Sequence, residues 1–129
     1  MDNGKTFFSA DAFAKDTGIE MLEVSSGRAK VKMEISEKHK NSHGTVHGGA
    51  IFTLADCAFG LASNSHGIPA VAINATISYM KSSRSGTLYA EACEFSKNPK
   101  LATYNVSVTN EDGEKIALFQ GMVYRKTPR

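Results

Sequence analysis

NSHGTVHGGAIFTLADCAFGLASNSHG, residues 41–67, contains the longest apolar stretch of the 129-residue chain. The pattern predicts a helix from Gly49 to about Ser65, preceded by Gly48 and followed by a polar turn that ends at Gly67. Apolar side chains surround this helix almost completely, which is typical of a helix that is buried on most sides. Only one charged residue, Asp56, lies within it.

On both sides of the helix, the sequence alternates between apolar and polar residues, as half-buried strands do. A short helix is predicted over Thr6–Lys15, and Asp112-Gly113 is a strong signal for a hairpin turn. The predicted strands cover Ile19–Val24, Arg28–Ile35, Val71–Met80, Thr87–Phe95, Leu101–Thr109 and Lys115–Arg125. Two strands, one long helix and four more strands predict an α+β fold, in which a largely antiparallel sheet wraps around the helix. One helix leaves part of such a sheet uncovered, which favours dimerisation.

The composition predicts one globular domain over residues 1–129. A net charge of +2, with no more than two basic residues in a row, argues against nucleic acid or a membrane as partner and is compatible with a small polyanionic ligand. No export signal is evident, and the apolar region 50–62 is too short to span a bilayer. The two cysteines, Cys57 and Cys93, do not make a disulfide framework, so we expect a cytoplasmic location.

The paired glycines at the start of the helix suggest one chemical role. Gly48 and Gly49 let a ligand approach the backbone closely, at a point where the first helical turn has unpaired N–H groups and the positive end of the helix dipole. A carbonyl oxygen placed there would be polarised, and a developing oxyanion would be stabilised. The alternative is that the two glycines only form a tight turn into the helix.

Asp56 suggests a second role. Burying a carboxylate costs several kcal/mol unless it is paired or solvated, and no lysine or arginine lies between Gly48 and Met80. An interface, a hydrated cavity or a catalytic function would explain the residue. The alternative is that Asp56 faces solvent or bonds to a neighbouring backbone group.

The spacing of these two features restricts how they can cooperate. Gly48 and Asp56 are eight positions apart, which corresponds to about 12 Å along a helix. A base or nucleophile must lie within about 3–4 Å of the atom that the oxyanion donors hold. If both residues act on one substrate, two antiparallel copies of the helix must therefore meet across a twofold axis.

The residues Asn41-Ser-His-Gly-Thr-Val-His-Gly-Gly-Ala-Ile-Phe-Thr-Leu-Ala-Asp56, followed by Asn64-Ser65, resemble the signature of hotdog-fold acyl-CoA thioesterases. The resemblance is greatest to the phenylacetyl-CoA (PaaI-type) branch and extends over nearly the whole domain. It implies a hotdog fold, a homodimer or homotetramer, an acyl-CoA substrate and no cofactor or metal. Another branch of the superfamily carries Glu in place of Asp56 and Thr one turn later, where this chain has Gly60.

The resemblance also implies a role for each residue of the motif. Asp56 would attack the thioester or activate a water molecule, and the Gly48 N–H would polarise the thioester carbonyl. Asn41 would help to place the carbonyl or the water, and His47 would line the mouth of the site together with Gly49.

Residues outside the motif complete the predicted site. Asn74, with Thr76 behind it, is the candidate to assist the water from the strand after the helix, although some relatives have serine there. Ser65 could cap the helix or line the pocket. Basic residues at strand ends could hold the phosphates of coenzyme A, or could be ordinary surface charges. They are Lys81, Arg84, Lys97, Lys100, Arg125 and Lys126.

Two other interpretations of the residues and two of the function remain open. His39, His43 and His47 would form a metal-binding face on a helix, but Gly44 makes a helix there improbable. Cys57 could be a nucleophile, although it projects about 100° away from Asp56 and favours core packing. At the level of function, the alternatives are a thioester hydratase or dehydratase of the same fold and a non-catalytic CoA-ester-binding protein. The sequence does not distinguish an aryl-acyl from a fatty acyl substrate.

Overall fold

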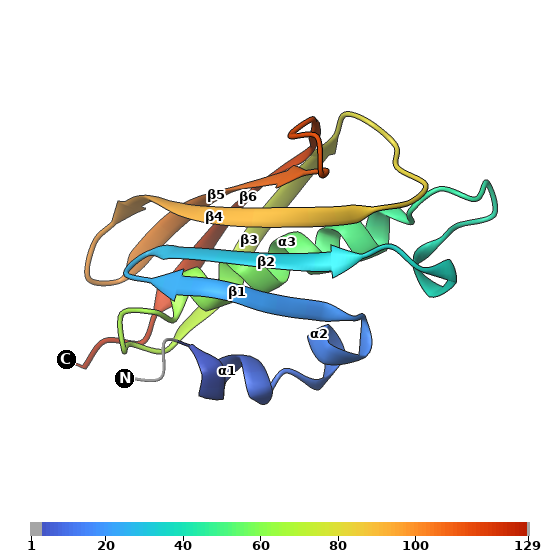
Figure 1. Cartoon of the computed structure of the whole chain (residues 1–129). Coiled ribbons are helices and arrows are strands. Elements are labelled where there is room, and N and C mark those ends of the chain that lie inside the picture. The colour runs from blue at the N-terminus through green and yellow to red at the C-terminus, as the bar shows by residue number, and fades with distance from the viewer. Residues whose placement is uncertain (1–3, 129) are drawn as a thin grey trace.

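The computed structural model describes residues 4–128, in which a six-stranded antiparallel sheet wraps around one long helix, α3 (Figure 1). The strand order is β1-β2-β4-β5-β6-β3. The helices are α1 (Lys5–Ser9), α2 (Ala12–Asp16) and α3 (Gly48–Ser63), with a short 3-10 turn at Glu37–His39. The strands are β1 (Ile19–Ser25), β2 (Arg28–Glu34), β3 (Ala70–Tyr79), β4 (Thr87–Lys97), β5 (Leu101–Thr109) and β6 (Lys115–Arg125).

This architecture confirms the predicted antiparallel sheet around one long helix. The helix predicted over Thr6–Lys15 is wrong in detail, because the segment forms two short helices with a break between them. The break arises at Asp11, whose carboxylate accepts a hydrogen bond from the Ala14 N–H at 3.0 Å and so starts α2. The expected domain limits of 1–129 include residues 1–3 and 129, which lie outside the described residues.

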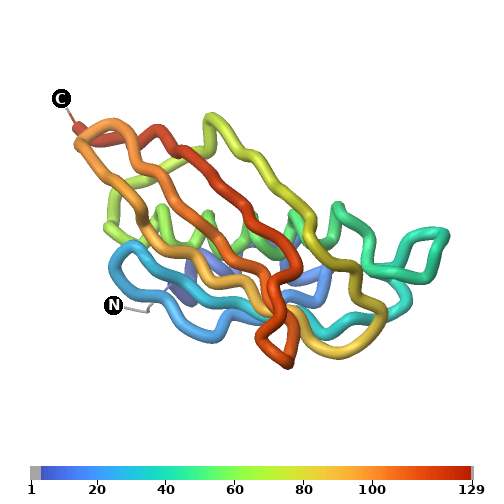
Figure 2. The backbone as a smooth tube through the Cα atoms, turned by 90° about the horizontal axis from the view of Figure 1, so that it is seen from above, coloured from blue at the N-terminus to red at the C-terminus, as the bar shows by residue number. Residues whose placement is uncertain are grey.

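The path of the chain places β3 at an edge of the sheet. After α3, the chain crosses to the far side and pairs β3 only with β6, while β1 forms the opposite edge (Figure 2). Four large apolar side chains on or just after β3 are exposed in the single chain. They are Val71, Ile73, Tyr79 and Met80, with exposed fractions between 44% and 55%. Such an edge is open to pairing with another chain.

The regular alternation predicted for Val71–Met80 is wrong at one point. The register with β6 shifts between Ala72 and Asn74, so a β-bulge interrupts the strand there. As a result, Ala72 shares the sheet side that faces α3 with Ala75 and Tyr79, although alternation placed it on the other side.

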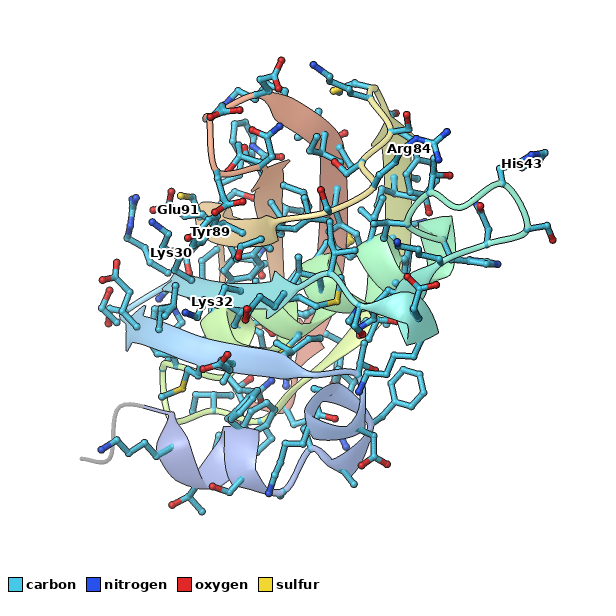
Figure 3. The ribbon with its side chains drawn as sticks, turned by 45° about the vertical axis from the view of Figure 1, so that its right-hand side comes forward. Lys30, Lys32, His43, Arg84, Tyr89 and Glu91 are labelled. Atoms are coloured by element: carbon cyan, nitrogen blue, oxygen red, sulfur yellow. The ribbon has the colours of Figure 1, made fainter. Side chains whose placement is uncertain are left out.

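The outer face of β2 and β4 is polar. On β2 and β4, Lys30, Lys32, Tyr89 and Glu91 point away from α3, and Lys30 lies over the Tyr89 ring at 5.5 Å (Figure 3). Arg28 pairs with Glu91 at 3.6 Å, and both side chains are about half exposed. Exposed pairs of this kind contribute little to stability, so the sheet is held mainly by its inner face.

The inner face packs its largest side chains around α3. Phe59 of α3 is 2% exposed and contacts Tyr104 and Phe119, with ring centroids 5.8 and 5.4 Å away. Gly121 of β6 lies directly beneath the Phe59 ring, and a Cβ atom at this position would be only 2.6 Å from it. The close approach of β6 to α3 therefore requires glycine here.

We expect Gly121→Ala to destabilise the protein by about 1–3 kcal/mol, because the new Cβ atom forces the buried Phe59 ring out of its contacts with Tyr104 and Phe119. Chemical denaturation of both proteins measures the difference in the free energy of unfolding. In a double-mutant cycle, Phe59→Leu should cost less in the Gly121→Ala background than in the wild type, since the smaller side chain leaves room for the new methyl group. Equal costs in both backgrounds would contradict the packing described here.

Candidate active site

One stripe of α3 is not covered by the sheet. Gly49, Thr53, Asp56 and Gly60 follow one another at spacings of four, three and four residues, and none of them is buried. On the sheet side of the helix, Leu54 and Ala58 are fully buried. Asp56 therefore lies on the outward face of the helix, where a ligand or a second chain can reach it.

The N-terminus of α3 leaves one backbone donor available. His47 caps the helix, with its Nδ1 accepting the Gly49 N–H at 2.9 Å, and its carbonyl accepts the N–H groups of Ala50 and Ile51. Within residues 4–128, the Gly48 N–H donates to no other group. It is the free donor of the first turn, at the positive end of the helix dipole.

Tyr79 belongs to this end of the helix, although the sequence does not single it out. Its hydroxyl group donates a hydrogen bond to the Gly48 carbonyl at 3.0 Å. A Cβ atom at position 48 would lie 3.1 Å from the Tyr79 ring, so close contact with the ring favours glycine at this position. Only the pairing of β3 with β6 brings Tyr79 here, and no local pattern in the sequence indicates that contact.

Asn41 organises the loop that leads into α3. Its side-chain oxygen accepts the N–H groups of His43 and Thr45, at 2.9 and 3.2 Å, and its amide group donates to the Thr45 hydroxyl at 3.0 Å. In the single chain, this side chain therefore shapes the loop. Its predicted contact with the substrate stays a prediction.

Two of the predicted basic residues lie after β3, close to this loop. Arg84 donates to the His43 carbonyl at 3.3 Å, and both residues are labelled in Figure 3. The neighbouring Val46 N–H donates to the Ser83 carbonyl, which joins the two segments. Lys81 forms an ion pair with Glu114. Both cations are exposed, and Arg84 is the one that contacts the loop before α3.

Asp56 lines a pocket of about 230 Å³ between α3 and the N-terminal helices. Partial burial raises the pKa of its carboxyl group, and the charge of Asp11 raises it further. The neighbouring Cys57 is 7% exposed, and burial, with Asp11 and Asp56 nearby, raises its thiol pKa to about 12. A neutral, buried thiol fits the core-packing interpretation of Cys57 better than a nucleophilic one.

Three other predicted residues do not line this pocket. Asn74 and Thr76 pair with Met122 and Gln120 of β6, which places them on the side of β3 that faces away from α3. Ser65 has a structural role, since its hydroxyl group accepts the Gly27 N–H at 2.8 Å and donates to the Ala62 carbonyl. Of the two roles suggested for Ser65, the single chain thus shows the cap at the end of α3.

The three histidines of the possible metal face have separate partners. His39 is buried, with Nε2 bonding to the Thr17 carbonyl at 2.5 Å and Nδ1 accepting the Ser36 N–H. His47 caps α3, and His43 lies in the exposed loop. Across residues 4–128, no three histidine, cysteine or acidic side chains are grouped so that they could hold a metal ion. Over the same range, no helix is long and apolar enough to cross a membrane.

The two principal features of the predicted site therefore do not meet in one chain. Asn41, His47, Gly48 and Gly49 gather at the start of α3, whereas Asp56 lies two turns further along the same helix. A rise of about 12 Å separates Asp56 from the free amide. One copy of the chain thus presents an oxyanion donor at one place and a carboxylate at another.

Comparison with known proteins places these features in a family. Residues 43–117 match the family model of the thioesterase superfamily. Acyl-coenzyme A thioesterase PaaI of Escherichia coli is 35% identical over 95% of this chain and 89% of its own length. Acyl-coenzyme A thioesterase 13 of Homo sapiens is 30% identical over 76% of this chain and 72% of its own.

Two solved structures agree with the sequence comparison. The E. coli PaaI protein from the phenylacetic acid degradation operon superposes with a TM-score of 0.93, at 34% identity, over 96% of this chain and 91% of that one. A mutant of the phenylacetic acid degradation protein PaaI from Thermus thermophilus superposes with a TM-score of 0.86, at 40% identity, over 89% of this chain and 99% of that one.

The chain belongs to the thioesterase superfamily, and its fold is the hotdog fold. Within the superfamily, it falls in the PaaI-type branch, as the motif around Asp56 predicts.

Proposed function

We propose that the protein hydrolyses an aryl-acyl- or fatty acyl-CoA thioester to the free acid and coenzyme A, in a site that two copies of the chain share. The observation that carries the proposal is the arrangement along α3. The free Gly48 amide and the outward-facing Asp56 are suited to one reaction, but they lie too far apart to act together within one chain. The relatives named acyl-CoA thioesterase support the substrate class.

The exposed edge of the sheet supplies a way to form the dimer. Antiparallel pairing of β3 with β3 of a second copy would extend the sheet and cover exposed apolar side chains such as Ile73. The two α3 helices would then run antiparallel beside the twofold axis. In this arrangement, Asp56 of one copy faces the start of α3 in the other, and each dimer has two equivalent sites.

The chemistry needs only these two groups. The thioester oxygen accepts the Gly48 N–H, which stabilises the negative charge that develops on it. The Asp56 carboxylate either removes a proton from a water molecule that attacks the carbonyl carbon, or attacks that carbon itself to give an anhydride that water then cleaves. In both routes the C–S bond breaks and coenzyme A leaves as the thiolate. A thiolate is a good leaving group near neutral pH, so the residues suffice without a metal.

The basic residues near the start of α3 are suited to the phosphates of coenzyme A. Arg84 contacts the loop that ends at His47 and is exposed, and Lys81 lies three residues before it on the same connecting segment. We expect Arg84 to contribute more than Lys81 to binding these phosphates, because Lys81 is already paired with Glu114.

A panel of CoA esters tests the proposed function. Release of free thiol should be observed with one or more aryl-acyl or fatty acyl esters, and the relative kcat/KM values will identify the acyl group. Hydration or dehydration of an enoyl- or hydroxyacyl-CoA without thiol release would favour the hydratase alternative. Binding of the esters with no turnover of any kind would favour the non-catalytic alternative.

A further inference from the structure

A pocket lies between the N-terminal helices and the face of α3 that carries Asp56. One wall consists of Phe7 and Phe8 of α1 together with Asp11, and the other includes Asp56 and Phe59 of α3. This N-terminal pocket, of about 230 Å³, is partly aromatic and has two carboxylates on facing elements. The sequence motif that points to Asp56 gives no indication of this second acidic residue.

Asp11 is held in a defined position. Its Oδ1 accepts the Ala14 N–H at 3.0 Å as the N-cap of α2, and the residue is half-buried. A capping hydrogen bond fixes the carboxylate relative to the helix, so its charge stays at the pocket wall. Asp11 is therefore a fixed neighbour of the pocket and not a freely rotating surface acid.

The other pocket-lining groups do not offset this charge. The ionisable residues in the lining are Asp11, Asp56 and Cys57, and the Cys57 thiol is neutral because its pKa is raised to about 12. The lining from α1, β3 and β6 is apolar and consists of Phe7, Phe8, Ala70, Ala72 and Val123. Among the pocket-lining residues within 4–128, Asp56 thus faces one fixed negative charge and no cation.

We propose that Asp11 is a positioning residue for the hydrolysis, which acts on Asp56 through its fixed negative charge across the N-terminal pocket. This inference rests on the proposed function. Repulsion between two carboxylates in a partly apolar pocket favours proton uptake by one of them. The pKa of Asp56 is raised in agreement with this repulsion, mainly by burial and in addition by the charge of Asp11. A carboxylate with a higher pKa is a stronger base, and this raises the rate of proton removal from water.

Two substitutions separate the charge of Asp11 from its structural role. Asp11→Asn removes the charge but keeps a good N-cap acceptor for the Ala14 N–H, whereas Asp11→Ala removes both. Asp112→Asn, in the exposed turn between β5 and β6, is the matched control for loss of one surface charge. Each full-length protein is assayed for kcat and KM from pH 4 to 9 by thiol release, and its melting temperature is measured.

The expected result is a change in the pH profile that both Asp11 variants share. Without the Asp11 charge, the pKa of Asp56 falls, so the acidic limb of kcat/KM moves to lower pH. At the plateau, kcat should fall about two- to fivefold with KM nearly unchanged. Asp11→Ala should also lower the melting temperature, and Asp112→Asn should match the wild type in both respects.

A wild-type pH profile and kcat for Asp11→Asn would overturn the inference, even if Asp11→Ala were impaired, because the residue would then act only as a helix cap. An acidic limb that moved to higher pH would also overturn it. These outcomes leave the proposed function intact. Failure of the proposed function has a different signature, namely no thiol release by the wild-type protein with any ester of the panel.

Discussion

Replacing Asp56 with asparagine should lower kcat/KM for the preferred acyl-CoA ester by about 10³-fold or more, because the only carboxylate on the outward face of α3 is lost. The fold should not suffer. Partial burial raises the pKa of Asp56, so the ionised form is disfavoured in the folded chain and costs stability above the pKa of the unfolded state. Removing the charge should therefore leave the melting temperature at neutral pH unchanged or slightly higher.

The measurement is steady-state thiol release with the purified variant, accompanied by thermal unfolding at pH 5 and pH 8. The stability gain over the wild type should be larger at pH 8 than at pH 5, because a larger share of wild-type Asp56 is ionised at the higher pH. Binding of the CoA ester should persist, since asparagine has nearly the same shape. Activity within tenfold of the wild type would contradict the role assigned to this carboxylate.

The second large loss of activity is expected on substitution of Gly48, where the Gly48→Pro and Gly48→Ala variants can be compared directly. Proline at position 48 removes the free N–H. It should be compatible with the helix, because proline is favoured at the first helical position. The preceding His47 already has the extended backbone that proline requires, with φ −63° and ψ 136°. Gly48→Pro should lower kcat by about 10²–10³-fold through loss of the oxyanion donor.

Gly48→Ala is the matched control, because it introduces the same Cβ contact with the Tyr79 ring at 3.1 Å but keeps the N–H. We expect it to lose much less activity than the proline variant. Tyr79→Phe, which removes the hydrogen bond to the Gly48 carbonyl, shows how much the position of the helix start matters. Equal losses for proline and alanine would assign the effect to crowding and not to the amide donor.

The sequence predicts the elements whose signals are local. The long apolar run with one carboxylate identifies α3, and the alternation over Arg28–Ile35 matches a β2 in which Ala29, Val31 and Met33 are buried. The hairpin signal at Asp112-Gly113 lies in the turn between β5 and β6. In these segments, the periodicity of the side chains follows directly from burial on one face.

The features that the sequence does not predict depend on contacts between distant segments. The bulge near Ile73 changes which side chains at the start of β3 face α3, so that Ala72 lies on the same side as Ala75 and Tyr79. The contact of Tyr79 with Gly48 arises because β3 crosses to the far edge of the sheet. Alternation alone carries no information on either point.

The same reason explains why the sequence does not single out Asp11. It lies 45 positions before Asp56 and within a segment predicted as one helix. Its significance follows from the break between α1 and α2 and from the folding of both short helices against α3. Asparagine or aspartate in such a segment does indicate a possible helix start, and this is the only local signal.

The central claim is that each site takes Asp56 from one chain and Gly48 from another, and mixed dimers test it most directly. Asp56→Asn and Gly48→Pro chains, each inactive alone, are denatured together in equal amounts, refolded and assayed for thiol release. In a shared site, every mixed dimer has one site with both defects and one with neither, so activity should recover to about a quarter of the wild-type value. No recovery above the sum of the two inactive proteins, with mixed dimers shown to be present, would contradict the account.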